Sequence, residues 1–319
     1  MRIPSLIFGV FLLGALQGCT KPSYESTKQP LVSATDSLVV HQSQEELIME
    51  QTAKLRVAQD MLDARNTLDW PRVYELFGED GVLSNMMTEP VVGAKAIQER
   101  FAAFEKGLSR MEFVVLNMGM LGEDVVIERL DSFDFEGRTG IVPVMGILTI
   151  EKGQVKEWRE YYDRAWLLSE MGVIEGEPPH PLAPRDSVLA SDMTDQARLA
   201  VAQAMLDAYE RLDWPAAAAL IAEEGQIHYA EPEPMVGPQG LLAHTARLGD
   251  KLSAVKFTVR NIGVVNGTVM TERIDHIEFN GVKGAVPVFG AMEIENGKIQ
   301  QWREYFDHHQ MLSAMGFVK

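Results

Sequence analysis

The sequence predicts two α+β domains in tandem, each with a curved, mostly antiparallel sheet and about three helices around a pocket. The first observation is an internal repeat with a constant offset of 144 residues, as from Met61 to Met205. The second is that helical patterning precedes strand patterning in each copy, which favours helices packed on one face of an antiparallel sheet. The third is a pair of Asn-Gly turns, at 280–281 and 296–297, between apolar strand-like segments. Asn-Gly is the strongest short signal for a β-hairpin.

The repeat contains no net insertion, so every loop has the same length in both copies. Four motifs establish the register: Met-Leu-Asp-Ala at 61–64 and 205–208, Leu-Asp-Trp-Pro at 68–71 and 212–215, Glu-Arg-Leu/Ile-Asp at 128–131 and 272–275, and Trp-Arg-Glu-Tyr at 158–161 and 302–305.

The elements of the second copy are predicted in order. Val201, Met205, Leu206 and Tyr209 have the spacing of one helical face. Asp213 precedes Trp-Pro and restarts a helix, because proline is tolerated in the first turn. The remaining segments are a short strand at 225–229, a helix at 238–248, and strands at 254–264, 269–279, 284–295 and 298–306. In the first copy the hairpin turns are Glu-Gly at 136–137 and Lys-Gly at 152–153.

The composition is that of a globular protein, with 46% hydrophobic and 24% charged residues among 319. The net charge of −17 comes without a basic cluster, so we expect no nucleic-acid partner. Cys19 is the only cysteine, which excludes an intrachain disulfide and a zinc site built from several thiolates. His276, His308 and His309 have no histidine counterparts in the first copy, so we expect no metal site and no cofactor.

The chain begins with a targeting signal. Residues 6–16 are almost wholly apolar, too short to span a bilayer comfortably but typical of a signal-peptide core. Leu-Gln-Gly-Cys at 16–19 resembles the bacterial lipobox, in which the cysteine is lipidated and becomes the new N-terminus. We therefore expect lipidation of Cys19 and a membrane-anchored location in the bacterial envelope, at the outer membrane or the periplasmic face if the host is Gram-negative. The alternative is an ordinary signal peptide followed by an unmodified cysteine.

The predicted organisation has five segments. They are a signal peptide at 1–18, a polar tether at 19–43, a first domain at 44–173, a proline-rich linker at 174–192 and a second domain at 193–319.

The candidate site lies on the last strands of each copy. Arg273 and Asp275 are two residues apart on a strand and share a face, as do Trp302, Glu304 and Phe306. If both faces point inward, an arginine lies between two carboxylates, an arrangement that suits paired acid–base catalysis. The alternative is a salt bridge without a catalytic role. The first copy has the corresponding set Arg129, Asp131, Trp158, Glu160 and Tyr162.

At these residues the chain resembles the limonene-1,2-epoxide hydrolase family, within the cystatin-like fold shared with nuclear transport factor 2 and SnoaL-type cyclases. The resemblance covers each copy nearly end to end. Its most specific motifs are Thr-Glu-Arg-Ile-Asp at 271–275, Val-Pro-Val-Phe-Gly at 286–290, Asn-Gly-Lys-Ile at 296–299 and Trp-Arg-Glu-Tyr-Phe-Asp at 302–307, with first-copy counterparts at 127–131, 142–146 and 158–163.

The resemblance implies metal-free opening of an epoxide in one step, without a covalent intermediate. The family's acid and its bridging arginine correspond to Asp275 and Arg273, and to Asp131 and Arg129. The base corresponds to Glu304 and Glu160, where the family usually has aspartate. The family's water-holding tyrosine and asparagine correspond to Ile227 and Tyr229, and to Leu83 and Asn85, so each copy departs from the pattern differently. We expect Asn85, Tyr229, Trp158 and Trp302 to contact water or substrate.

Three functions remain open from the sequence. The first is hydrolysis of a small hydrophobic epoxide to a diol. The second is binding of a hydrophobic ligand without chemistry. The third is a structural role at the envelope, in which the two domains pair within the chain as family dimers do. Asp163 and Asp307, at the ends of the last strands, are interpreted as helix caps.

Overall fold

The computed structural model describes residues 34–175, 193–229 and 233–318. The expected signal peptide, Cys19 and nearly all of the expected linker at 174–192 lie outside these ranges. Residues 34–43, the last part of the expected tether at 19–43, lie in the first helix. Within the described residues, no helix combines the length and apolarity needed to cross a bilayer.

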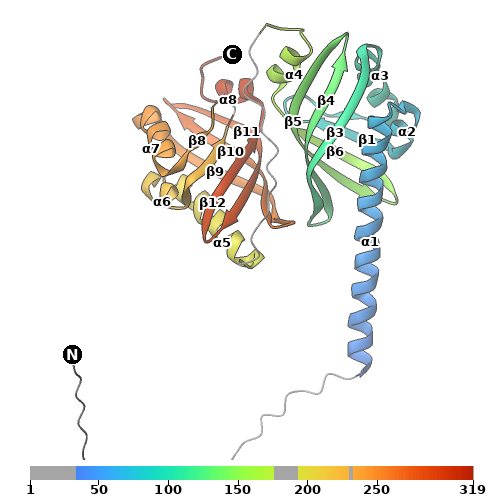
Figure 1. The fold of residues 1–319 in the computed structure, drawn as a ribbon, viewed down its shortest axis with the longest axis horizontal. Coiled ribbons are helices and arrows are strands. Elements are labelled where there is room, and N and C mark those ends of the chain that lie inside the picture. Colours follow the sequence, from blue (N-terminus) through green and yellow to red (C-terminus); the bar gives the residue numbers. More distant parts are fainter. Residues whose placement is uncertain (1–33, 176–192, 230–232, 319) are drawn as a thin grey trace, which may run out of the picture. The chain divides into compact units, whose positions relative to one another are not determined.

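The described residues of the first repeat form four helices and six strands (Figure 1). The helices are α1 (Ala34–Asn66), α2 (Trp70–Leu76), α3 (Ala94–Gly107) and α4 (Arg164–Glu170). The strands are β1 (Phe77–Asn85), β2 (Val91–Val92), β3 (Leu108–Leu121), β4 (Asp124–Phe135), β5 (Arg138–Glu151) and β6 (Gln154–Tyr161).

The second repeat has the same element order with one added turn of 3-10 helix. Its helices are α5 (Asp195–Glu210), α6 (Trp214–Ala219), α7 (Gly237–Leu248), η1 (Gly249–Lys251) and α8 (His308–Ala314). Its strands are β7 (Ile221–His228), β8 (Met235–Val236), β9 (Leu252–Val265), β10 (Thr268–Phe279), β11 (Val282–Glu295) and β12 (Lys298–Tyr305). Among the described residues, each repeat has the expected three α-helices before its last strand and a further short one, α4 or α8, after it.

The two sheets share one topology. Their strand orders are β2-β1-β6-β5-β4-β3 and β8-β7-β12-β11-β10-β9. The long strands form an antiparallel meander, whereas β1 pairs parallel with β6 and β7 pairs parallel with β12. The α+β class with two tandem domains is therefore confirmed, and each sheet is mixed.

The hairpin turns occur where the sequence predicts them. Asn280 and Gly281 have φ of 50° and 79°, and Asn296 and Gly297 have φ of 51° and 72°. Two consecutive positive φ angles define the turn whose twist matches that of the flanking strands. This geometry explains why strand ends were predicted to within a few residues.

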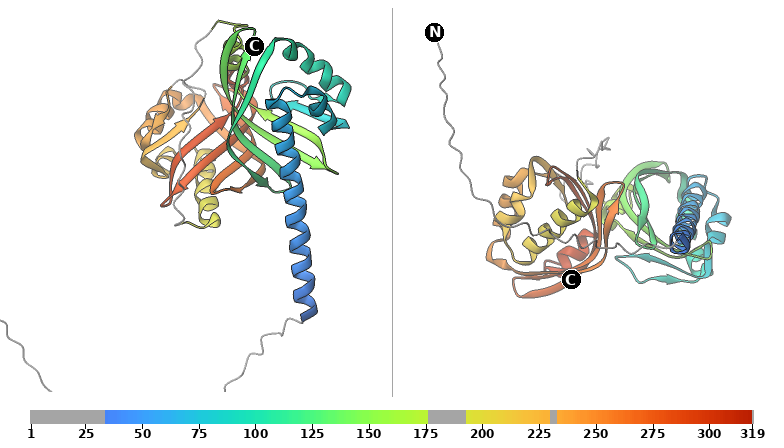
Figure 2. Two further views of the ribbon diagram at one scale, coloured as in Figure 1. Left: turned by 45° about the vertical axis from the view of Figure 1, so that its right-hand side comes forward. Right: turned by 90° about the horizontal axis from the view of Figure 1, so that it is seen from below.

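The core of each repeat forms between the first helix and the sheet (Figure 2). In the second repeat, Ala202 and Met205 of α5 pack with Val269 and Trp302 of the sheet. The helical face predicted from the sequence is therefore the buried face. At the end of α5, Leu212 adopts a φ of 54° and Asp213 caps α6 through a bond from the Ala216 N–H at 3.1 Å.

The two repeats contact each other through their sheets. Glu272 of the second repeat accepts hydrogen bonds from Arg159 Nε at 2.8 Å and Tyr161 at 2.9 Å in the first. The reciprocal carboxylate, Glu128, accepts from Arg303 Nε at 2.5 Å and Tyr305 at 2.7 Å. These polar contacts adjoin a shared apolar cluster of Leu121, Val126, Met145, Ile147 and Tyr161 with Val265, Met270, Phe289, Ala291 and Tyr305.

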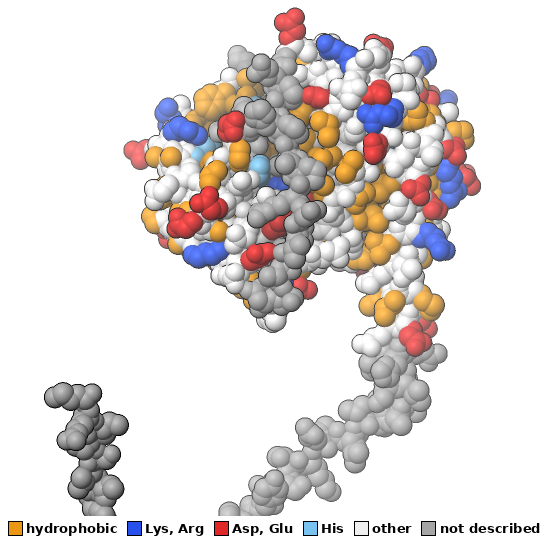
Figure 3. Space-filling model, viewed as in Figure 1, with side chains coloured by type: hydrophobic (Ala, Val, Ile, Leu, Met, Phe, Trp, Pro, Cys, Tyr) orange, Lys and Arg blue, Asp and Glu red, His pale blue; other side chains and the backbone are white. Residues whose placement is uncertain are grey.

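The surface carries both signs of charge. On the face shown in Figure 3, Asp and Glu side chains are interspersed with Lys and Arg. An acidic net charge distributed in this way favours solubility and says little about the ligand of the pockets.

Candidate acid–base sites in the two repeats

The predicted triad of the second repeat is assembled around one guanidinium. Arg273 Nε lies 2.8 Å from Asp275 Oδ1, and Arg273 Nη2 donates to Asp275 Oδ2 at 3.1 Å. The same Nη2 donates to Glu304 on β12. A single arginine therefore binds both carboxylates, as the strand spacing predicted.

A glycine on the strand between them leaves space for Arg273 to contact Glu304. The strand between β10 and β12 is β11, on which Gly290 pairs with Thr271 and with Glu304. A Cβ at Gly290 would lie 2.7 Å from Arg273 Nη1 and 2.8 Å from Glu304 Oε1. Gly146 has the same role in the first repeat, where a Cβ would lie 2.5 Å from Arg129 Nη1.

Burial changes the protonation of the second triad. The side chains of Arg273 and Glu304 are each 2% exposed. Burial raises the pKa of Glu304 to about 7, and burial likewise raises the pKa of Asp275, although Arg273 opposes both shifts. Two nearby carboxylates with raised pKa values influence each other's titration, and a pKa of about 7 lets Glu304 exchange a proton near neutral pH.

The second triad faces an apolar cavity of about 280 Å³. Trp302 and Tyr229 line it, as predicted, together with Tyr209 from α5. The Tyr209 and Tyr229 hydroxyls are 2.8 Å apart. Burial raises the pKa of both phenols, so both remain neutral hydrogen-bonding groups beside the carboxylates.

The first repeat contains the same triad. Arg129 Nε donates to Asp131 Oδ1 at 2.7 Å, and Arg129 Nη2 donates to Asp131 Oδ2 at 3.1 Å and to Glu160. Burial raises the pKa of Asp131 to about 6. The conserved arrangement of the two triads follows from the identical register of their strands.

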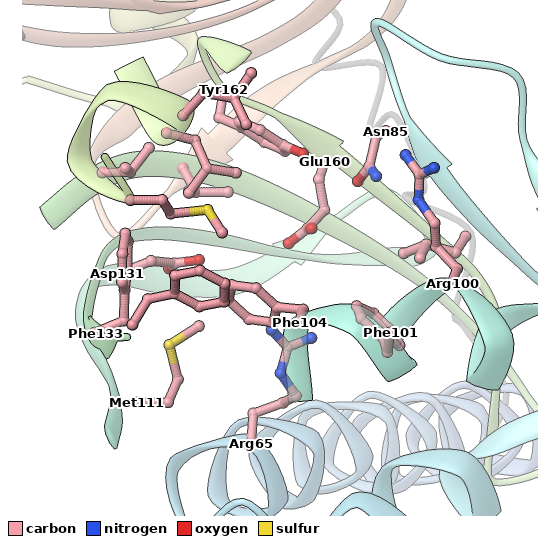
Figure 4. A pocket seen from close by; sticks show the side chains of 17 residues that line it. Arg65, Asn85, Arg100, Phe101, Phe104, Met111, Asp131, Phe133, Glu160 and Tyr162 are labelled. Atoms are coloured by element: carbon pink, nitrogen blue, oxygen red, sulfur yellow. The ribbon is translucent and has the colours of Figure 1, made fainter. Parts of the chain in front are cut away.

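The cavity of the first repeat is larger, about 420 Å³, and differs in its polar groups (Figure 4). Asp131, Glu160 and Asn85 line it, as predicted, and so does Tyr162. Trp158 does not line it, contrary to our expectation of a water or substrate contact. Its side chain is fully buried, with its ring 5.6 Å from the Arg129 guanidinium.

Sequence reasoning missed the cavity residues contributed by helices. Arg65 of α1 and Arg100 of α3 line the first cavity, where the second has Tyr209 and His244. Each pair is separated by the repeat offset of 144 residues. A position-by-position comparison of the two copies identifies these residues. The residue type differs between the copies at both positions, whereas the position within the repeat is the same.

The strand-end aspartates are helix caps, as predicted. Asp163 Oδ1 accepts from the Trp166 N–H at 2.7 Å, and Asp307 Oδ1 accepts from the Gln310 N–H at 2.9 Å. Each also reaches the other repeat, since Asp307 Oδ2 accepts from the Arg164 N–H and Asp163 Oδ2 from the His308 N–H.

Two family models match the chain, one in each repeat. The model for the limonene-1,2-epoxide hydrolase catalytic domain matches residues 196–316, and that for a SnoaL-like domain matches residues 58–158.

Three solved structures with similarity to the chain each cover less than two fifths of it. A limonene-epoxide-hydrolase-like epoxide hydrolase of Mycobacterium tuberculosis is 21% identical, with 38% of this chain and 90% of that chain covered and a TM-score of 0.35. A hypothetical protein of Catenulispora acidiphila with a ketosteroid isomerase-like fold is 18% identical, with 37% and 93% covered and a TM-score of 0.34. A Burkholderia pseudomallei protein of unknown function, similar to nuclear transport factor 2, is 14% identical, with 39% and 98% covered and a TM-score of 0.35.

Proposed function

Because this chain belongs to the family of limonene-1,2-epoxide hydrolases and SnoaL-like proteins, we propose that its second repeat hydrolyses a small apolar epoxide to a diol. The observation that carries this proposal is the triad itself. One buried arginine binds two buried carboxylates at the wall of an apolar cavity. Such a pair can donate one proton and accept another in the same step.

The reaction assigns one role to each carboxyl group. Glu304 in its ionised form removes a proton from water, and the water oxygen forms a bond to one epoxide carbon. The bond from that carbon to the ring oxygen breaks, and Asp275 in its acid form protonates that oxygen. The product is a neutral diol, and transfer of one proton from Glu304 to Asp275 restores the starting state. Arg273 holds both carboxyl groups at hydrogen-bond distance throughout.

The tyrosine pair supports a water site next to the base. Tyr229 occupies the position of the family's asparagine, and the usual tyrosine is replaced by Ile227. Tyr209 reaches the cavity from α5 and bonds to Tyr229, so two hydroxyls can orient a water in place of the family's hydroxyl and amide. The glutamate side chain is one methylene longer than the family's aspartate, so its carboxylate extends further from the strand.

The test is turnover of the full chain with a panel of apolar epoxides in ¹⁸O-labelled water. We expect one labelled oxygen in each diol. Glu304→Gln and Asp275→Asn should each lower turnover by about 10²–10⁴-fold, because each removes one proton transfer.

Glu278→Gln is the matched control, since Glu278 lies on the same strand as Asp275 but does not line the cavity. It should retain wild-type turnover. Full diol production by Glu304→Gln would contradict the assignment of the base.

Binding without turnover is the second candidate for this cavity. It is favoured by the substitution of glutamate for the family's usual aspartate at Glu304. Recovery of bound but unaltered epoxide across the panel would support it and would exclude hydrolysis.

A further inference from the structure

We propose that the cavity of the first repeat is a binding site for an apolar molecule that carries a single carboxylate, with Arg65 and Arg100 as its partners. This site is separate from the proposed hydrolase site of the second repeat.

Arg65 is a buried cation for which no hydrogen bond to a carboxylate is present among the described residues. Its side chain belongs to a residue only 6% exposed, and its Nε has no hydrogen-bond acceptor among the described residues. Buried charges in proteins are normally paired, because an unpaired charge loses its hydration without compensation. Burial lowers the pKa of Arg65, and the nearby carboxylates of Glu160 and Asp131 oppose this shift.

Aromatic rings hold the Arg65 guanidinium in place. Its central carbon lies 4.9 Å from the ring centre of Phe101, 5.2 Å from that of Trp70 and 5.5 Å from that of Phe113. Such cation–π contacts stabilise a cation but leave its N–H groups unbonded. Figure 4 shows the guanidinium directed into the cavity, beside Phe104 and below Glu160.

The carboxylates already present in this cavity are satisfied by another residue. Arg129 binds both Asp131 and Glu160. The two buried arginines, Arg65 and Arg129, match these two carboxylates in charge, and Arg100, an exposed residue that lines the same cavity, adds one positive charge in excess. A ligand with one negative charge would balance it.

The second cavity lacks this excess. At the positions equivalent to Arg65 and Arg100 it has Tyr209 and His244, and Tyr209 is bonded to Tyr229. Arg273 then faces Asp275 and Glu304 without further arginines on the cavity wall. The two repeats therefore share a triad but differ in the charge that they offer to a ligand.

The remainder of the first cavity is apolar. Phe104, Met111, Phe133 and Val144 are among its wall residues. A carboxylate prefers the planar donor fork of an arginine, and a hydrocarbon body gains by leaving water. An apolar monocarboxylate fits both parts of the wall, with its carboxylate at Arg65 and Arg100.

The test is calorimetric titration of the full chain with decanoate and, separately, with 1-decanol. We expect decanoate to bind at least about 10-fold more tightly than the alcohol, because only the carboxylate pairs with the arginines. Arg65→Met should weaken decanoate binding about 10–100-fold and leave 1-decanol binding unchanged. Retained alcohol binding also shows that the variant is folded and its cavity intact. Arg65→Lys, which keeps the charge, should restore part of the loss.

Arg110→Met is the matched control, because Arg110 is a partly exposed arginine of the same repeat that pairs with Asp134 outside the cavity. It should bind decanoate as the wild type does. Equal affinity for decanoate and 1-decanol, or decanoate binding unaffected by Arg65→Met, would overturn the proposal. Tighter binding of decyl phosphate than of decanoate would overturn the assignment of a carboxylate. None of these outcomes depends on turnover of an epoxide.

Discussion

At the scale of single residues, the environment of Glu304 links function to stability. Its carboxyl group is buried near Asp275, and the Arg273 guanidinium compensates both carboxylates. The same burial that prepares the pair to share a proton also makes the doubly ionised state costly for the folded protein.

The ionisation of Glu304 should therefore make the free energy of unfolding depend on pH within a defined range. The pKa of Glu304 rises from 4.5 to about 7 on folding, so between these values the folded chain binds more protons than the unfolded chain. The free energy of unfolding should fall as pH rises through this window, by roughly 1–3 kcal/mol from this group. Glu304→Gln should lack that decline. Urea unfolding of the wild type and of Glu304→Gln at pH 5 and pH 8 measures this decline in the free energy of unfolding.

Glu278→Gln provides the control for this experiment, because Glu278 is partly exposed on a strand of the same sheet. It should show the wild-type pH dependence. An equal decline in the wild type and in Glu304→Gln would refute the burial argument.

At the scale of elements, the strands were predictable and their parallel pairing was not. The expected strand at 269–279 is β10, Thr268–Phe279, because Asn-Gly and the alternation of side chains define it locally. The expected short strand at 225–229 became β7, Ile221–His228, paired parallel with β12. Parallel pairing joins segments distant in sequence, so no local pattern specifies it.

The central strand β11 should be intolerant of a side chain at Gly290. A methyl group there would approach Arg273 and Glu304 to less than 3 Å. We expect Gly290→Ala to displace the triad and to lower diol formation by about 10-fold or more, since small misplacements of acid–base groups are costly.

The matched substitution is Gly78→Ala on β1, where the nearest heavy atom would be 3.5 Å from the new Cβ. Diol formation by this variant should equal that of the wild type. Undiminished turnover in Gly290→Ala would show that the triad does not need this space.

At the scale of the whole molecule, reciprocal buried ion pairs join the repeats. Glu128 and Glu272 are each 1% exposed, and each accepts from an arginine and a tyrosine of the other repeat. The expectation that the domains pair within the chain as family dimers do stays a prediction, and these contacts support it.

Removing one of these carboxylates should destabilise the whole protein. Glu272→Gln leaves Arg159 buried with less compensating charge, which should lower the free energy of unfolding by on the order of 3 kcal/mol. Lys283→Gln, which breaks an exposed pair with Glu278, should change it by less than about 1 kcal/mol. Denaturant unfolding of the three proteins measures both effects, and equal stability of Glu272→Gln and the wild type would count against the bridge.

By itself the sequence determined the duplication, the hairpin turns and the triad of each copy. Each depends on residues close together along the chain, or on strands joined by short turns. Only the tertiary structure decided which helix residues enter the cavities and which carboxylates join the repeats. Arg65 and Tyr209 meet their triads through packing of a helix on a sheet, and Glu128 meets Arg303 across 175 residues of chain. Such contacts depend on how complete helices and sheets pack together, and the spacing of residues within one segment of the sequence does not predict them.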